Sequence, residues 1–164
     1  MHDREEPCEV LVPVYSVGER RGEESLPAVV VGPGRYRLLA SPGYVEGLAA
    51  GDEFELSPHA PQGYRVLARS GNLCIWLYFH HEVDAERVET ADLPRAVDAL
   101  GGRLDGGWSR MLVLTVPLSA GWAAIESSMN AAVERLGASS WCYGNVYDPI
   151  DGITPLGWWE ERRG

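Results

Sequence analysis

The sequence LCIWLYF at residues 73–79 decides the fold of this chain. Its side chains are apolar on both faces of a strand, which predicts a central strand that is covered from both sides. After this strand the apolar spacing changes from every second residue to a period of 3.6. Helices are therefore expected over 92–100 and 119–136, with a buried strand at 111–116 between them and a final strand at 139–146.

The expected ends of the two helices have recognisable residues. Asp92 is a candidate N-cap of the first helix, which Gly101 would end. Ser119 is a candidate N-cap of the second helix, and Gly137 would end it because glycine readily adopts the left-handed conformation.

Before this region, apolar and polar side chains alternate in a pattern that is typical of half-buried strands. Pro13 places the first of these strands at a sheet edge, because proline has no backbone N–H to donate to a neighbouring strand. The charged segment GERRGEE at 18–24 is expected to be a turn or loop. Further strands are expected at 26–31, 35–40, 53–56 and 64–68.

This order predicts an α+β fold for residues 1–164 as a single compact domain. A strand-rich N-terminal half, 9–70, continues into a ferredoxin-like β-α-β-α-β half, 71–147, with two helices on one sheet face. Residues 148–164 would form a tail. A subdivision near residue 70 is possible, although no flexible linker marks it.

The charge of the chain disfavours several functions. Fourteen cations, all arginine, stand against 24 acidic residues in the 164-residue sequence, which gives a net charge of −10. Without lysine there is no Schiff-base chemistry and no phosphate-binding lysine. No basic stripe is present, so direct nucleic-acid binding is not expected. An anionic surface attracts basic partners instead.

The chain also lacks the sequence signals of a membrane or secreted protein. Its longest apolar run, residues 73–79, is far shorter than the roughly 20 residues that span a bilayer. The acidic start MHDREEPCEV does not resemble a signal peptide. We expect a cytoplasmic protein without membrane contact.

Metal and cofactor binding are not expected. The three cysteines, Cys8, Cys74 and Cys142, form no pair at ligand spacing. His80 and His81 are adjacent, so on a strand their side chains would point to opposite faces. The segment DPIDG at 148–152 resembles an acidic calcium loop, but it lacks the closing glutamate and is better explained by Asx turns.

Catalysis is not indicated either. No G-x-S-x-G nucleophile motif, Walker motif or zinc-protease motif is present, and no acid–base pair follows from the linear order. We expect no enzyme. A hydrolase or transferase using His80 or His81 with a distant carboxylate is the catalytic alternative.

A block in the N-terminal half resembles an uncharacterised bacterial domain family. The residues that carry the resemblance are Gly34-Arg35-Tyr36-Arg37-Leu38, Pro42, and Gly47-Leu48-Ala49-Ala50-Gly51-Asp52 before a strand. Some proteins similar to this family are immunity proteins against type VI secretion effectors, including nuclease toxins. The resemblance therefore implies a binding protein whose partner is a cognate toxin, which we expect to be a basic nuclease.

The contact residues are predicted from chemistry rather than from this resemblance. Acids in loops suit a cationic partner, and Trp and Tyr often dominate protein interfaces. One alternative for the two terminal tryptophans is that they anchor the tail onto the fold. Another alternative for the whole protein is a small-molecule or regulatory module with a pocket lined by Tyr and Trp. The predicted contact residues are Tyr44, Glu46, Asp52, Asp148, Asp151, Trp158, Trp159, Glu160 and Glu161.

Overall fold

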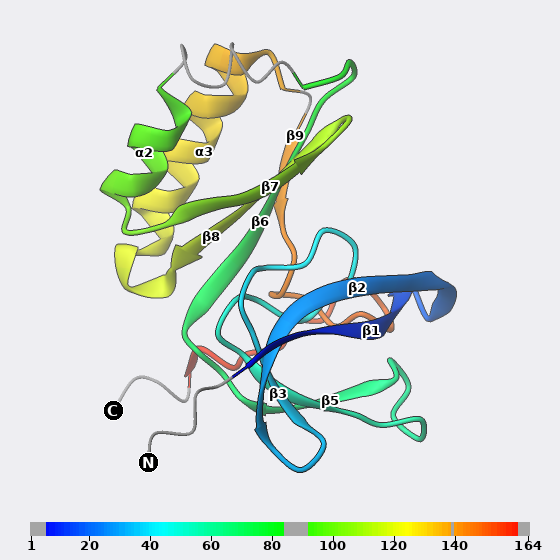
Figure 1. The fold of residues 1–164 in the computed structure, drawn as a ribbon. Helices are drawn as coiled ribbons and strands as arrows, with labels where there is room; N and C mark the ends of the chain where they lie inside the picture. The colour runs from blue at the N-terminus through cyan, green and yellow to red at the C-terminus, as the bar shows by residue number, and fades with distance from the viewer. Residues whose placement is uncertain (1–5, 84–91, 139, 161–164) are drawn as a thin grey trace, which may run out of the picture.

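The computed structural model describes residues 6–83, 92–138 and 140–160, which form two antiparallel sheets (Figure 1). The first sheet follows the order of the chain, and β1 lies at its edge, as Pro13 predicted. Antiparallel neighbours in this order need only short connections. The strands of this sheet are β1 (Pro7–Ser16), β2 (Glu19–Gly32), β3 (Arg35–Leu38), β4 (Glu53–Leu56) and β5 (Tyr64–Ala68).

The second sheet has the strand order β7-β8-β6-β9, and its elements run β-α-β-β-α-β along the chain. This is the ferredoxin-like arrangement. Both helices cover the same face of the sheet (Figure 1). The elements are β6 (Asn72–Tyr78), α2 (Leu93–Ala99), β7 (Arg103–Trp108), β8 (Met111–Pro117), α3 (Trp122–Leu136) and β9 (Ser140–Tyr143).

The α+β class and the ferredoxin-like half are confirmed, but two strand predictions were wrong. The prediction omitted β7, whose sequence RLDGGW lacks an alternating pattern and contains a bulge between Leu104 and Gly106. The segment GERRGEE is not a loop, because β2 already begins at Glu19 and pairs with β1. Only Val17 and Gly18 form the turn, both with positive φ, as a two-residue hairpin requires.

The helix ends also differ from the sequence prediction. Asp92 is at the N-cap position of α2, but its backbone is left-handed (φ 58°) and its side chain makes no capping bond. Ser119 lies in a 3-10 turn, Leu118–Ala120, and Gly121 precedes α3 instead. The end of α3 is as predicted: Gly137 has a φ of 66°.

Each half has its own buried core. In the second half β6, which is buried from Leu73 to Leu77, packs beneath α3 through residues such as Ile75 and Met129. In the first half Phe54 and Leu38 lie at the centre. The other face of the second sheet is covered by the first half, where Trp76 packs beside Ala49.

Hydrogen bonds from the second sheet to the segment after β3 join the two halves. The Trp76 indole N–H donates to the Pro42 carbonyl at 2.8 Å. Arg103 donates to the Leu39 carbonyl at 2.6 Å. The segment after β9 runs against both halves, since Gly144 accepts a bond from Gly47 and Trp158 enters the second core. No described helix has the length and apolar character needed to span a membrane.

Candidate functional site

The loop that follows β3 is held by one carboxylate. Glu24 on β2 accepts backbone N–H bonds from Gly43, Tyr44 and Val45 at 2.8, 2.8 and 2.9 Å. Three successive N–H groups on one carboxylate fix the path of the backbone, because each such bond is charge-assisted. The loop therefore presents the Tyr44 side chain, which is 52% exposed, in a defined place.

The same loop packs against the segment that follows β9. Gly47 donates its N–H to the Gly144 carbonyl at 2.8 Å, and the Tyr64 hydroxyl donates to the Glu46 carbonyl. Gly47 has a φ of +95°, and a Cβ at this position would collide with the Tyr64 hydroxyl and lie 3.2 Å from Pro149. Only glycine allows this close approach.

These contacts bring two predicted acids to one region. Burial raises the pKa of Glu46, and it also raises the pKa values of Tyr64, Tyr78 and Cys142, to which the Glu46 charge adds a smaller rise. Asp148 acts on Tyr64 in the same direction. We call the region the Glu46 surface and define it by Tyr44, Glu46, Tyr78, Cys142 and Asp148. It combines negative charge with exposed phenol rings.

Two predicted contact residues are buried and are corrections to the predicted set. Asp52 is inside the fold because its carboxylate binds Arg69 and the Ser70 and Ala49 N–H groups. Trp158 is only 8% exposed, because its ring completes the second core and its indole N–H donates to the Asn145 carbonyl at 2.9 Å. Neither side chain is available to a partner.

The other predicted residues are nearer the C-terminus. Asp148 and Asp151 accept local N–H bonds in Asx turns, which supports the turn explanation over a calcium loop. The pKa of the exposed Asp151 is lowered by its bonds to Thr154. Trp159 is half-buried and packs edge-on against Trp122 at 5.4 Å between ring centroids, while Glu160 is exposed. Glu161 lies outside the described residues.

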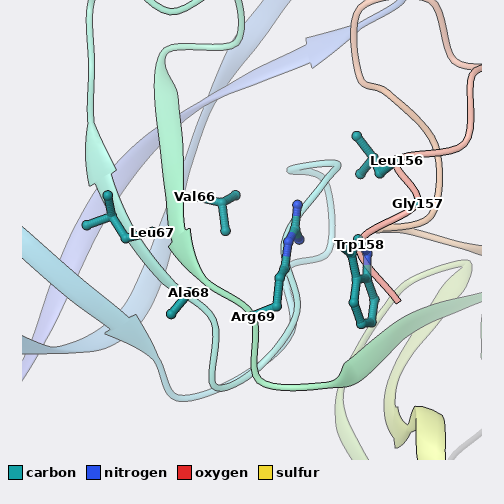
Figure 2. A pocket seen from close by; sticks show the side chains of 7 residues that line it. All are labelled: Val66, Leu67, Ala68, Arg69, Leu156, Gly157 and Trp158. Atoms are coloured by element: carbon teal, nitrogen blue, oxygen red, sulfur yellow. The ribbon is translucent and has the colours of Figure 1, made fainter. Parts of the chain in front are cut away.

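A second candidate site lies between β5 and the C-terminal segment. This pocket has a volume of about 500 Å³. The Arg69 and Trp158 side chains lie side by side at its wall (Figure 2). The guanidinium lies 5.6 Å from the Trp158 ring centroid, donates to the Gly47 carbonyl at 2.6 Å and pairs with Asp52 at 3.2 Å. The lining residues are Val66, Leu67, Ala68, Arg69, Leu156, Gly157 and Trp158.

Arg69 is mainly a structural cation. Burial raises the pKa of Asp52, and the Arg69 charge partly offsets that rise. The guanidinium thus holds together β5, the loop at Gly47 and the C-terminal segment. The pocket contains one aromatic ring rather than the several Tyr and Trp rings expected for a ligand pocket between the halves.

The histidines of the catalytic alternative lie at the end of β6. Both His80 and His81 are exposed, and His81 packs edge-on against Phe79. In the described part of the chain no three His, Cys, Asp or Glu side chains gather as metal ligands would. Cys74 is fully buried, and burial raises the pKa of its thiol well above the ordinary value.

The structure also groups residues that sequence reasoning missed. Tyr78 and Cys142 lie in different strands, the pairing of β6 with β9 brings them together, and the Glu46 charge acts on both. Glu126 on α3 raises the pKa of Tyr143 on the other face of β9. No linear motif marked these residues, because each lies in an ordinary strand or helix pattern.

Comparisons with known proteins place this architecture in a family. A family model described as a domain of unknown function matches residues 24–141, from β2 to the start of β9. The chain belongs to the DUF4265 family. The match includes Glu46 and Arg69, whereas Asp148 and Trp158 lie beyond it. No match was found among curated proteins.

The fold of this DUF4265 protein has been seen elsewhere. It is similar to a structure described as a "Novel crystal structure of a hypothetical protein from Neisseria gonorrhoeae", with a TM-score of 0.58 and 15% sequence identity. The similarity covers 94% of this chain and 100% of that chain. At this identity the likeness concerns the fold alone.

Proposed function

We propose that this protein is a cytoplasmic immunity protein that binds a cognate secreted bacterial toxin. The toxin class that fits best is a type VI nuclease effector. A nuclease needs cationic groups to hold phosphates, and a compact anionic protein can cover them. The proposal involves binding only and assigns no catalytic step to this chain.

The observation that carries the proposal is the composition of the Glu46 surface. Glu46 and Asp148 come from segments about 100 residues apart in the sequence, yet both act on Tyr64. Tyr44, in the same loop as Glu46, is 52% exposed, and Tyr78, on which the Glu46 charge acts, is 36% exposed. Acids next to exposed tyrosines suit a cationic protein surface, because tyrosine supplies apolar contact area and carboxylates supply complementary charge.

The net charge of −10 adds a kinetic advantage. Opposite charges steer two proteins together and raise the association rate, and this effect weakens as salt screens the charges. In the complex, this protein would cover the active site or the substrate groove of the toxin. The block at residues 34–54 resembles an uncharacterised bacterial domain family, and the immunity role of some proteins similar to that family supports the same function.

The test is co-expression with a secreted nuclease encoded next to this gene. We expect cells to survive and a salt-sensitive complex to be recovered. Glu46→Gln with Asp148→Asn should weaken the complex by at least about tenfold, which is a change of about 1.4 kcal/mol. The matched control, Asp98→Asn with Glu134→Gln, removes the same charge from exposed helix positions and should have little effect. Death of the co-expressing cells would contradict the proposal.

The pocket beside Arg69 favours a second candidate, a small-molecule-binding module. A volume of about 500 Å³ is within the range of ligand sites. Thermal unfolding of the isolated protein with a panel of metabolites tests this function. A ligand that raises the melting temperature without any protein partner would favour it over immunity.

A further inference from the structure

The edge of the second sheet at β9 is open among the described residues. In the strand order β7-β8-β6-β9, the strand Ser140–Tyr143 pairs only with β6. An unpaired strand edge presents N–H and C=O groups that a further strand can bond. Edges of this kind are used by proteins that bind an extended segment of a partner.

The pairing shows which groups face outward. Gly144 donates its N–H to the Cys74 carbonyl at 2.7 Å, so it takes the hydrogen-bonded position of the ladder opposite Cys74, whose own N–H donates to the Asn145 side chain. Hydrogen-bonded pairs alternate along an antiparallel ladder, which makes Cys142 with Trp76 the next bonded pair. The N–H and C=O groups of Trp141 and Tyr143 therefore point away from β6, toward the open edge.

Both sides of this edge are acidic and aromatic. On the helix side, Tyr143 packs between Trp122 and Trp141 with ring centroids 5.4 and 5.0 Å away, and burial together with the nearby Glu126 charge raises its pKa. On the opposite side, burial raises the pKa of Cys142, and the Glu46 charge adds to that rise. Successive side chains of an added strand point to alternate faces, so each face would meet a carboxylate.

One polar atom of the Tyr143 side chain lacks a hydrogen-bond partner in the described part of the chain. The Tyr143 hydroxyl oxygen is buried and has no hydrogen-bond partner among the residues that the structure describes. Buried hydroxyls are normally bonded, and each exception calls for an explanation. This hydroxyl belongs to one of the two residues whose backbone groups face the open edge.

We propose that the β9 edge binds an extended, basic segment of a partner protein as an added strand. The backbone of Trp141 and Tyr143 would supply the hydrogen bonds, and Glu126 and Glu46 would select arginine or lysine on the two faces. This inference rests on the proposed function for the identity of the partner, the toxin, but its first test does not.

The test measures amide hydrogen exchange of the full chain with a short peptide in which arginine and threonine alternate. We expect the Trp141 and Tyr143 amides to exchange at least about tenfold more slowly when the peptide is bound, because they gain partners. A peptide with glutamate in place of arginine should have no such effect. Unchanged exchange at both amides with the arginine peptide would overturn the proposal.

A pair of variants separates the backbone from the side chain. Trp141→Ala and Trp141→Pro both remove the indole, but only the proline variant also removes the outward N–H. With both folded by circular dichroism, Trp141→Pro should bind the arginine peptide at least about tenfold more weakly than Trp141→Ala. Equal affinities would refute strand addition. If Trp141→Pro does not fold, the exchange measurement on the wild-type chain decides.

The toxin distinguishes this inference from the proposed function. If the chain protects cells and the Trp141 and Tyr143 amides exchange in the toxin complex as they do in the free protein, the edge inference is wrong and immunity stands. If the arginine peptide slows both amides but the toxin is neither bound nor neutralised, the edge assignment stands and immunity is wrong.

Discussion

Asp52 shows how burial changes the role of a residue that looks functional in the sequence. Its carboxylate accepts bonds from Ala49, Ser70 and Arg69, and its side chain is 1% exposed. A carboxylate in this setting is costly unless a cation and N–H groups compensate it. Gly51, with a φ of 85°, lies in a turn before β4, but the Asp52 carboxylate that follows it belongs to the interior.

Arg69→Ala tests this arrangement. The substitution leaves the Asp52 carboxylate buried without its cation and should lower the free energy of unfolding by about 3 kcal/mol at neutral pH. The matched control is Arg65→Ala on the same strand, whose pair with Glu55 is exposed and should contribute at most about 1 kcal/mol. Urea unfolding of both variants measures the difference.

The loss in Arg69→Ala should depend on pH. Burial raises the pKa of Asp52, and removing Arg69 raises it further. The folded state then binds a proton more readily than the unfolded state, so stability increases as the pH falls toward the raised pKa. The deficit relative to wild type should therefore be smaller at about pH 5 than at about pH 7. A deficit that grows on acidification would contradict this account.

At the scale of elements, the candidate site depends on how loops are tied to strands. Glu24 lies on the long strand β2, in a segment whose charges suggested a loop, and it bonds three N–H groups of the 43–45 segment. The shape of the Glu46 surface therefore depends on the hairpin of β1 and β2, which lies earlier in the chain.

Glu24→Ala should release this loop. The loss of three bonds to a charged acceptor is expected to cost about 2 kcal/mol of stability and to speed amide exchange at Gly43, Tyr44 and Val45. Glu9→Ala on the adjacent strand removes one exposed bond to Ser25 and serves as the control, with an effect below about 0.5 kcal/mol. Equal exchange at the three loop amides in Glu24→Ala and wild type would show that Glu24 does not hold the loop.

At the scale of the whole molecule, the two sheets are joined by buried polar contacts rather than by a linker. The Thr115 hydroxyl donates its hydrogen to the Asp105 carboxylate. In the bond between the Ser41 and Thr115 hydroxyls, Ser41 is therefore the donor. The Ser41 oxygen also accepts the Ala50 N–H. Asp105 also accepts the Ser41 N–H at 2.8 Å. A network in which each member is satisfied favours one relative placement of the halves.

This junction predicts that the halves unfold together. Urea unfolding followed by circular dichroism and by tryptophan fluorescence should give coincident curves for the wild-type chain. Trp76→Phe removes the buried bond to Pro42 and should cost about 1 to 2 kcal/mol. Trp141→Phe removes a comparable but exposed bond to Asn130 and should cost less. Curves that separate in the wild type would show two independent units.

Local pattern determined much of this protein from the sequence alone: the α+β class, the buried strands at 73–79 and 111–116, the edge position of the strand that contains Pro13, and the glycine that ends α3. These features depend on periodicity and backbone preference within short segments. Tertiary structure alone decided that Asp52 and Trp158 are buried and that β7 completes the second sheet. It also brought Glu46 near Tyr78, and it placed both Glu46 and Asp148 where their charges act on Tyr64. Burial and proximity arise when distant segments pack together, and no short stretch of sequence carries that information.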